Sequence, residues 1–294
     1  MDTFLIIAGI ILLLILWSFI EKKLLTTTNY LLSSPKLGKN FQETAFVVLA
    51  DLHNQTFGRH NKRLIRKIDQ RKPDFIIIVG DMITKKRKCR NSNAFTLISL
   101  LTKKYKIYYA YGNHEQYMEL LKTEAKHLAE YQDWLNYRQD LLNLGVIFLN
   151  NTEHIIAIDN TNIHISGVTI DAEYYNRKKP KEMQVGYIET QLGKKKGETY
   201  HILIAHSPVY FKEYINWGAD LTLAGHLHGG LIRLPFLGGM LSPQVEFFPK
   251  YDAGSLSEDG KVMIVSKGMG SHSALPRLFN PPEIVHITLK GNAR

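Results

Sequence analysis

The sequence contains a single cysteine, Cys89, and this scarcity narrows the chemistry that the chain can carry. One thiol excludes an internal disulfide bond, and it excludes a zinc site built from several thiolates. Cys89 lies in the basic run KKRKCR, and we interpret it as incidental. The composition fits a reducing compartment. A metal site in this chain would therefore be built from nitrogen and oxygen ligands.

The sequence also lacks a continuous basic tract, although its net charge is +10. Lysine and arginine gather in short, separate clusters at 85–90, 177–179 and 194–196. No aromatic residues are interleaved with these clusters in the way that base stacking requires, so nucleic acid is not an expected partner. Solvated loops are the simplest interpretation, and attraction to anionic lipid headgroups is the functional alternative.

Residues 4–20, FLIIAGIILLLILWSFI, lack any charge. As an α-helix this run would be about 25 Å long, close to the roughly 30 Å hydrocarbon core of a bilayer. A cleaved signal peptide needs a basic beginning and a small-residue cleavage site, and neither is present. We therefore expect a single-pass membrane anchor over residues 1–23. Because Lys22 and Lys23 follow the run, the positive-inside rule predicts that the rest of the chain faces the cytoplasm.

Beyond the anchor, the sequence suggests a tether and one domain. Residues 24–43 are polar and are interpreted as a tether, and a domain is expected over 44–294. The strand-like apolar runs lie at 45–50, 74–80, 106–112, 201–206 and 220–225, with further strands expected within 153–170 and 261–268. Helical spacing is found at 61–71, 94–104 and 116–143. This alternation predicts an α/β fold, a layered β-sandwich of mixed sheets flanked by helices.

Each of the five apolar runs is followed by side chains that can bind a metal or transfer a proton. In chain order these are Asp51, His53, Asp81, Asn113, His114, Glu115, His206, His226 and His228. Because α/β sheets place their sites at the carboxyl ends of the strands, we expect these side chains to converge. Carboxylate, imidazole and amide ligands suit manganese, iron or zinc. The set is large enough for two ions, with Asp81 as the bridging candidate.

The motifs D-x-H, G-D, G-N-H-E, a single H and G-H-x-H, in this order, resemble those of the calcineurin-like metallophosphoesterases. The resemblance covers the chain from about Phe46 to the end. The segments AGHLHGGLIRLP and VSKGMGSHSALPRLFNPPEIVHITL are similar to its membrane-tethered bacterial branch, which includes phosphodiesterases and UDP-2,3-diacylglucosamine hydrolases. The resemblance implies a metal-dependent phosphoesterase with two divalent ions, Mn²⁺, Fe²⁺ or Zn²⁺.

The resemblance also implies a role for each motif residue. One ion would be held by Asp51, His53, Asp81 and His228, and the other by Asp81, Asn113, His206 and His226. A hydroxide that bridges the two ions would attack phosphorus opposite the leaving group. His114 is then the expected proton donor to the leaving oxygen. Glu115 either orients a histidine or is a carboxylate at a helix N-terminus.

The expected substrate is a phosphodiester or a pyrophosphate, with a lipid-linked nucleotide such as UDP-2,3-diacylglucosamine as one hypothesis. A protein phosphatase of the same fold and a non-catalytic membrane scaffold that retains metal are the alternatives. The apolar loop 234–251 is either buried or in contact with a bilayer or an acyl chain. Arg233 contacts either a phosphate or a structural carboxylate, and His272 in GMGSHS could face the site.

Overall fold

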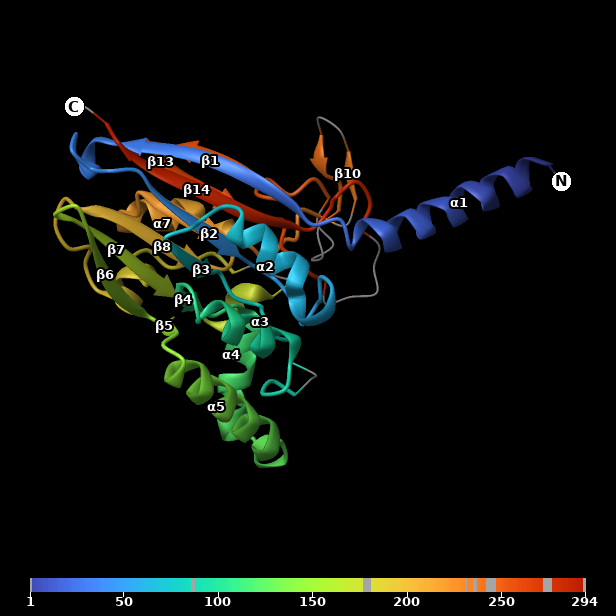
Figure 1. Cartoon of the computed structure of the whole chain (residues 1–294), viewed down its shortest axis with the longest axis horizontal. Coiled ribbons are helices and arrows are strands. Elements are labelled where there is room, and N and C mark those ends of the chain that lie inside the picture. The colour runs from blue at the N-terminus through green and yellow to red at the C-terminus, as the bar shows by residue number, and fades with distance from the viewer. Residues whose placement is uncertain are drawn as a thin grey trace.

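The computed structural model describes residues 2–85, 88–176, 181–230, 232–234, 237–241, 247–271 and 277–292. Within these ranges, the strands form two six-stranded mixed sheets and a two-stranded hairpin. An apolar layer lies between the two sheets, and helices cover their outer faces (Figure 1). The layered α/β sandwich expected from the sequence is confirmed.

The first sheet has the strand order β1-β14-β2-β3-β4-β5. Its strands are β1 (Thr26–Ser34), β2 (Thr44–Leu49), β3 (Phe75–Ile78), β4 (Lys106–Ala110), β5 (Ile147–Leu149) and β14 (Glu283–Gly291). Strands β2 to β5 run parallel to one another, whereas β14 is antiparallel to β2 and parallel to β1. The central strands are covered on both faces, which explains why they are apolar without alternation.

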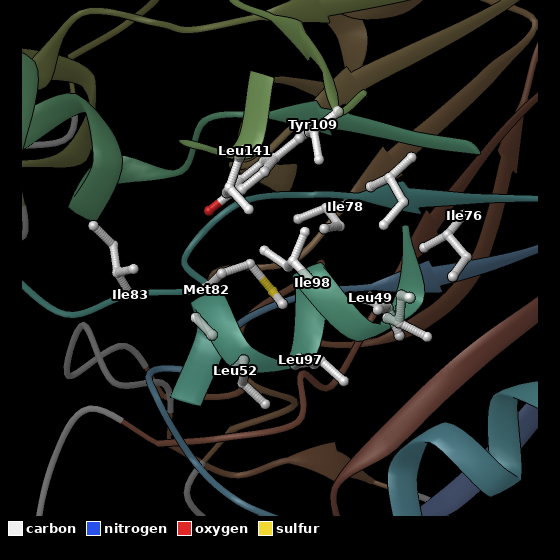
Figure 2. Close-up of a cluster of buried hydrophobic side chains, with 14 of the residues drawn as sticks. Leu49, Leu52, Ile76, Ile78, Met82, Ile83, Leu97, Ile98, Tyr109 and Leu141 are labelled. Carbon is white, nitrogen blue, oxygen red and sulfur yellow. The ribbon is translucent and has the colours of Figure 1, made fainter. Parts of the chain in front are cut away.

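The outer face of the first sheet is covered by helices of its parallel crossovers. These are α2 (Lys62–Asp69), α3 (Asn93–Leu101), α4 (Asn113–Leu120) and α5 (Leu128–Asn143). Figure 2 shows Leu97 and Ile98 of α3 in the same apolar cluster as Ile78 and Met82. The helix expected over 116–143 is interrupted by the short 3₁₀ helices η3 (Leu121–Thr123) and η4 (Ala125–His127), so the single long helix was wrong.

The second sheet has the strand order β12-β13-β9-β8-β7-β6. Its strands are β6 (Thr152–Ile158), β7 (Thr161–Val168), β8 (Tyr200–Ala205), β9 (Leu221–Ala224), β12 (Gly254–Glu258) and β13 (Lys261–Val265). The β6-β7 and β12-β13 pairs are antiparallel, and the pairs between β7, β8, β9 and β13 are parallel. Its outer face is covered by α6 (Tyr187–Leu192) and α7 (Phe211–Trp217).

The remaining elements are short and lie in the connections between the longer ones. They are the strands β10 (Arg233–Leu234) and β11 (Gly238–Gly239), and the 3₁₀ helices η1 (Pro35–Leu37), η2 (Arg59–Asn61), η5 (Ala172–Tyr175) and η6 (Pro208–Tyr210). The β10-β11 hairpin follows the G-H-x-H motif directly. The turn η5 and the hairpin therefore lie in segments that frame the carboxyl ends of the strands.

Residues 24–43 are not the tether expected from the sequence. Thr26–Ser34 forms β1, which pairs with β14 from Thr26↔Glu283 to Ser34↔Gly291. The composition TTTNYLLSS concealed this strand because β1 is an edge strand with half-exposed side chains. Only Tyr30 and Leu32 of β1 pack against the apolar layer between the sheets. The ordered body of the protein therefore begins near Thr26 rather than at residue 44.

The N-terminal helix α1 (Asp2–Glu21) leaves the body of the protein as a separate rod (Figure 1). Its 20 residues give a length of about 30 Å, which matches the hydrocarbon core of a bilayer. Most of its large apolar side chains are exposed, and it has the length and composition of a membrane span. Only its last turn is buried against the body, through Ser18 and Glu21.

Candidate metal centre

The side chains that follow the five apolar strands come together at one edge of the sandwich. Strands β2, β3 and β4 of the first sheet supply some of them, and β8 and β9 of the second sheet supply the rest. Three groups have ligand atoms within 4.8 Å of one another: Asp51, His53 and His228; Asp81, His206 and His226; and His53, Asp81 and His114. The site thus lies between two sheets, whereas the sequence suggested the edge of one.

The first group surrounds a point between three buried side chains. The Nε2 atoms of His53 and His228 are 3.2 Å apart. Oδ1 of Asp51 lies 3.8 Å from Nε2 of His53 and 3.7 Å from Nε2 of His228. Two imidazole nitrogens and a carboxylate oxygen that face one another in this way are a suitable donor set for a divalent transition metal.

Asp81 lies between the groups. Its Oδ2 atom is 3.3 Å from Nε2 of His206, 3.8 Å from Nε2 of His53 and 3.8 Å from Nε2 of His114. A carboxylate that is shared between two sets of histidines occupies the position that a bridging ligand needs in a dinuclear site.

A backbone carbonyl determines which nitrogen of His206 faces this carboxylate. Nδ1 of His206 donates a hydrogen bond of 2.6 Å to the carbonyl oxygen of Val79, so the lone pair of a neutral ring is on Nε2. Histidines that bind metals commonly have their other ring nitrogen held by such a partner. Val79 closes the strand run before Asp81, and the two sheets are therefore linked at the site.

The buried carboxylates of Asp51 and Asp81 and the ring of His206 form a charged cluster that would be stabilised by a bound cation. Burial raises the pKa of Asp51 to about 7, although His206 opposes this shift. Burial would lower the pKa of His206, but Asp81 and Asp51 outweigh it and raise that pKa to about 10. The pKa of Asp81 lies well below its usual range because the neighbouring histidines outweigh burial. Two desolvated carboxylates in one site are stabilised by bound positive charge.

Asn113 supplies a further argument that the residues fit a metal. It is the first residue of α4, directly after Gly112, and its Oδ1 atom is buried with no hydrogen-bond partner. A buried amide oxygen without a partner costs about 1–3 kcal/mol, so such an atom in a polar site indicates a ligand. Asn113 lies beside Asp81 at the start of α4, since the amide of the next residue, His114, donates a hydrogen bond of 2.9 Å to Oδ1 of Asp81.

The backbone is strained at most of the expected metal ligands. Positive φ angles are found at Asp51 (52°), His53 (47°), Asp81 (53°), His226 (71°) and His228 (53°). Left-handed conformations at residues other than glycine cost roughly 1–3 kcal/mol each and cluster at functional sites. They turn the chain sharply at the strand ends, so that successive motif side chains can point into one site.

Two glycines are required by close approach to the aspartates. A Cβ atom at Gly225 would lie 2.5 Å from Oδ2 of Asp51, and one at Gly112 would collide with the carboxylate of Asp81. Glycines before Asp81, Asn113 and His226 would also fit tight turns that leave the next side chain free to project. Gly112 has a φ of −92°, so at this position the close packing against Asp81, rather than a left-handed turn, excludes other residues.

His114 lies at the edge of the metal-ligand groups and is almost fully buried. The backbone amide of Lys85 donates a hydrogen bond of 3.1 Å to its Nδ1 atom, so a neutral ring carries its proton on Nε2. That Nε2 atom faces Asp81 at 3.8 Å. The arrangement presents an N–H group beside the proposed reaction centre.

Glu115 holds the turn that carries Asp81. Its carboxylate accepts hydrogen bonds from the backbone amides of Asp81 (2.7 Å), Met82 (3.0 Å) and Ile83 (3.3 Å), and from that of Gly112 (3.0 Å). The hydroxyl of Tyr109 donates a further bond of 2.8 Å. Glu115 is thus a carboxylate at the N-terminus of α4 that positions a backbone turn. These five hydrogen bonds come from backbone amides and from Tyr109, so they support the role at the helix N-terminus rather than the orientation of a histidine.

Three residues that support the site were not among the expected site residues, although Arg277 and Asn280 lie in the segment VSKGMGSHSALPRLFNPPEIVHITL. The ring of Tyr175 is edge-to-face with that of His226, with 5.0 Å between centroids. Nδ2 of Asn280 donates to the carbonyl oxygens of His228 (2.7 Å) and Gly230 (2.6 Å). Arg277 donates to backbone carbonyls of the 267–270 turn. Support through ring faces and carbonyl oxygens leaves no spacing signal in a sequence.

Other expectations have mixed outcomes. Nη1 of Arg233 donates to Oδ2 of Asp252 at 2.8 Å and to the carbonyl of Gly229, so its role is structural and the phosphate contact is not supported. Phe247 and Phe248 in the apolar loop 234–251 are exposed, so ordinary burial was wrong for these two side chains. His272 lies outside the described residues.

Comparison with known proteins now identifies the family. The sequence pattern of the calcineurin-like phosphoesterases matches residues 44–230. This chain belongs to that family. The metallophosphoesterase resembles an uncharacterized metallophosphoesterase of Aquifex aeolicus (27% identity, 94% of this chain and 95% of the relative) and phosphodiesterase YaeI of Escherichia coli (27% identity, 82% and 80%).

A third relative is the UDP-2,3-diacylglucosamine pyrophosphatase LpxG of Chlamydia muridarum, with 22% identity over 95% of this chain and 93% of the relative. The family and these relatives make the chain a metal-dependent phosphoesterase, as the motifs implied. The expected class of enzyme is confirmed, and the non-catalytic scaffold loses its support. The His/Asp groups agree with the divalent metals that the family uses.

Proposed function

We propose that this metallophosphoesterase is anchored in a membrane and cleaves a phosphodiester or pyrophosphate bond at a dinuclear metal centre. The observation that carries the proposal is the place of the Asp81 carboxylate, 3.3 Å from His206 and 3.8 Å from His53. A carboxylate oxygen that faces both His53 and His206 would suit a ligand shared by two ions. A single transition-metal ion usually has about four ligands, whereas seven residues are proposed as donors here, enough for two ions. They are Asp51, His53, Asp81, Asn113, His206, His226 and His228.

Each ion has its own set of donors in this proposal. Asp51, His53, Asp81 and His228 would hold one ion, and Asp81, Asn113, His206 and His226 would hold the other. When bound, two divalent ions polarise the phosphoryl oxygens and provide a nucleophilic water at neutral pH. The chain contributes the positions of these donors through the strained strand ends and through the hydrogen bonds of Val79 and Glu115.

His114 is the proposed proton donor. Its Nε2 atom lies 3.8 Å from Oδ2 of Asp81, on the side of the proposed metal ligands. The amide of Lys85 donates to Nδ1, so a neutral ring has its proton on Nε2 and can donate it there. Protonation of the leaving oxygen by a positioned imidazole contributes roughly 10²–10⁴-fold to such reactions. The benefit is greatest for an alkoxide or phosphate leaving group that leaves poorly without a proton.

We further propose that the substrate is linked to a lipid. One similar protein is named for UDP-2,3-diacylglucosamine, and α1 has the dimensions of a membrane span. Lys22 and Lys23 follow α1, and by the positive-inside rule they favour a catalytic body on the cytoplasmic side with contacts to anionic headgroups. We include lipid-linked nucleotide pyrophosphates in the substrate class, with Mn²⁺, Fe²⁺ and Zn²⁺ as candidate ions.

Metal analysis of the purified full-length protein, followed by a substrate panel, tests the proposal. We expect about two ions per chain and hydrolysis of a soluble nitrophenyl diester when Mn²⁺ is added. Asp81→Asn should lower turnover by about 10³-fold or more and reduce the metal content. Asp69→Asn is the matched control, because Asp69 forms a surface ion pair with Lys104. Wild-type turnover in Asp81→Asn would contradict the dinuclear centre.

A further inference from the structure

The last turn of α1 is joined to the body by buried hydrogen bonds. The backbone amide of Arg277 donates to Oγ of Ser18 at 3.1 Å, and that of Phe279 donates to Oε2 of Glu21 at 2.8 Å. Both Ser18 and Glu21 are buried, unlike the rest of the helix. Removal of α1 as a signal peptide would leave two backbone amides of the body without these partners. The end of the helix is therefore part of the folded unit.

The segment that receives α1 also supports the metal centre. The guanidinium of Arg277 donates to the carbonyl of Gly270 at 2.9 Å, and the amide of Gly270 donates to the carbonyl of Asp51. In the same segment, Asn280 donates to the carbonyl of His228 at 2.7 Å. Two proposed metal ligands are thus connected to the end of α1 through a short series of hydrogen bonds.

Exposed apolar side chains lie on Phe279 at this junction and on segments that are hydrogen-bonded to it in series. Leu237, Phe247, Phe248 and Phe279 are 65%, 68%, 55% and 54% exposed, and we call these four residues the junction surface. Backbone bonds connect them: the amide of Arg233 donates to Leu278, that of Met240 to Ile232, and that of Phe248 to Met240. Figure 1 shows the β10 hairpin beside the point where α1 leaves the body.

We propose that the junction surface lies in the interfacial layer of the membrane that α1 spans, so that the metal centre is held at the bilayer and receives phosphate groups from lipid-linked substrates. This inference rests on the proposed function. Three features select a lipid surface as the occupant: continuity with the apolar helix, aromatic side chains, and cationic Lys22 and Lys23 directly after the span. Phenylalanine and leucine side chains combined with lysine are typical of segments that bind in the membrane interface.

The four large apolar side chains of the junction surface would be more stable in an apolar environment than in water. Because α1 is docked rather than connected by a flexible linker, little orientational freedom is lost when these side chains enter the interface. A lipid-linked substrate then needs to lift only its phosphate groups toward the site.

Fluorescence quenching in vesicles tests the location of the junction surface. The full-length protein would be reconstituted in phosphatidylcholine–phosphatidylglycerol vesicles with brominated acyl chains, as Phe247→Trp, Phe279→Trp and Leu128→Trp variants. Leu128 is 56% exposed and is the matched control, since it belongs to α5, which Figure 1 shows at the bottom of the view, away from α1 and the β10 hairpin. After subtraction of the wild-type emission, we expect about twofold quenching for the first two variants and none for the control.

Quenching equal to that of Leu128→Trp would overturn the inference. So would an unquenched signal accompanied by dimerisation in vesicles, because the surface would then be occupied by a second copy of the chain. The quenching experiment needs no turnover. The quenching result can therefore fail separately from the proposed hydrolysis, which is contradicted only if no phosphoester is cleaved.

Activity provides a second readout. The double variant Phe247→Ser, Phe279→Ser should hydrolyse a lipid-linked pyrophosphate in vesicles about tenfold more slowly, with the soluble nitrophenyl diester unchanged. Leu128→Ser should change neither rate. An equal loss on both substrates would overturn the inference, because the junction surface would then affect the site rather than the approach to the membrane.

Discussion

The backbone amide of Lys85 donates a hydrogen bond of 3.1 Å to Nδ1 of His114. An amide nitrogen can only donate, so the ring must accept at Nδ1 and a neutral ring holds its proton on Nε2. This nitrogen is the one that faces Asp81, at 3.8 Å. A loop after β3 therefore selects the tautomer of a side chain on α4, and it selects the one that a proton donor requires.

Replacement of His114 should affect substrates according to their leaving groups. We expect His114→Asn to lower kcat by about 10²–10⁴-fold for an alkyl diester, whose leaving oxygen needs a proton. The loss should be small for a nitrophenyl diester, because nitrophenolate leaves without protonation. Metal content measured on the same sample should equal that of the wild type. Equal losses on both substrates, or loss of an ion, would contradict the role of proton donor.

Glu115 should contribute to stability through the turn that it holds. In Glu115→Gln, one oxygen and an NH₂ group replace the carboxylate that accepts from Asp81, Met82 and Gly112. Since hydrogen bonds to charged groups contribute about 1.5–3 kcal/mol, we expect unfolding free energy to fall by about 2–4 kcal/mol. Denaturant titration measures the change. Glu119→Gln, which alters a side chain nearer the surface, is the control, and equal effects would exclude the special role of Glu115.

The fold was predictable where burial leaves a periodic signal. Strands such as β3 are covered on both faces, and a run like FIII indicates them directly. The polar strand β1 was missed because an edge strand needs few apolar side chains, and its pairing with β14 involves residues more than 250 positions away. The break between α4 and α5 was missed because Leu121 and Leu128 keep helical spacing across it. The backbone between them leaves the helical conformation at Glu124, which is extended (φ −111°, ψ 102°).

The site was predictable as far as its chemistry requires particular side chains. Metal-binding groups must be carboxylate, imidazole or amide, so Asp81 and His206 stand out after apolar strands. Residues that act through backbone groups can be seen only in three dimensions. Arg277 and Asn280 lie in a segment quoted for the resemblance, but they donate to carbonyl oxygens, which every residue possesses, so the sequence does not reveal which residues they hold.

The stability of the body should depend on pH through His201, on the second sheet. Burial lowers the pKa of His201 to about 4, from an ordinary value of 6.5. The unfolded chain binds this proton below pH 6.5 and the folded chain does not, so the contribution of the neutral ring is present above pH 6.5 and is lost as the pH falls towards 4. We expect the difference in unfolding free energy between wild type and His201→Gln to shrink over this range.

The measurement is a pair of denaturant titrations at several pH values between 4 and 7.5, without metal. Titration of the other groups cancels in the difference between wild type and variant. His127→Gln is the control, since His127 lies at the surface beside Glu124 and Glu130. A difference that stays constant with pH would show that His201 titrates alike in the folded and unfolded chains.

Gly225 should tolerate no side chain, because of its close approach to Asp51. A Cβ atom there would lie 2.5 Å from Oδ2 of Asp51 and 3.2 Å from Cβ of Ala50. Neither neighbour can retreat easily, because Ala50 is in the buried layer between the sheets and the Asp51 carboxylate accepts from the amide of His226. Gly225→Ala should therefore displace Asp51, which is a proposed ligand.

In this variant we expect metal binding to weaken about tenfold or more, with turnover falling in parallel. Gly9→Ala is the control, since a Cβ atom at Gly9 meets nothing within 4 Å. Added Mn²⁺ should restore part of the lost turnover if the aspartate is merely displaced, and normal metal affinity in Gly225→Ala would mean that the approach of the two segments does not position Asp51.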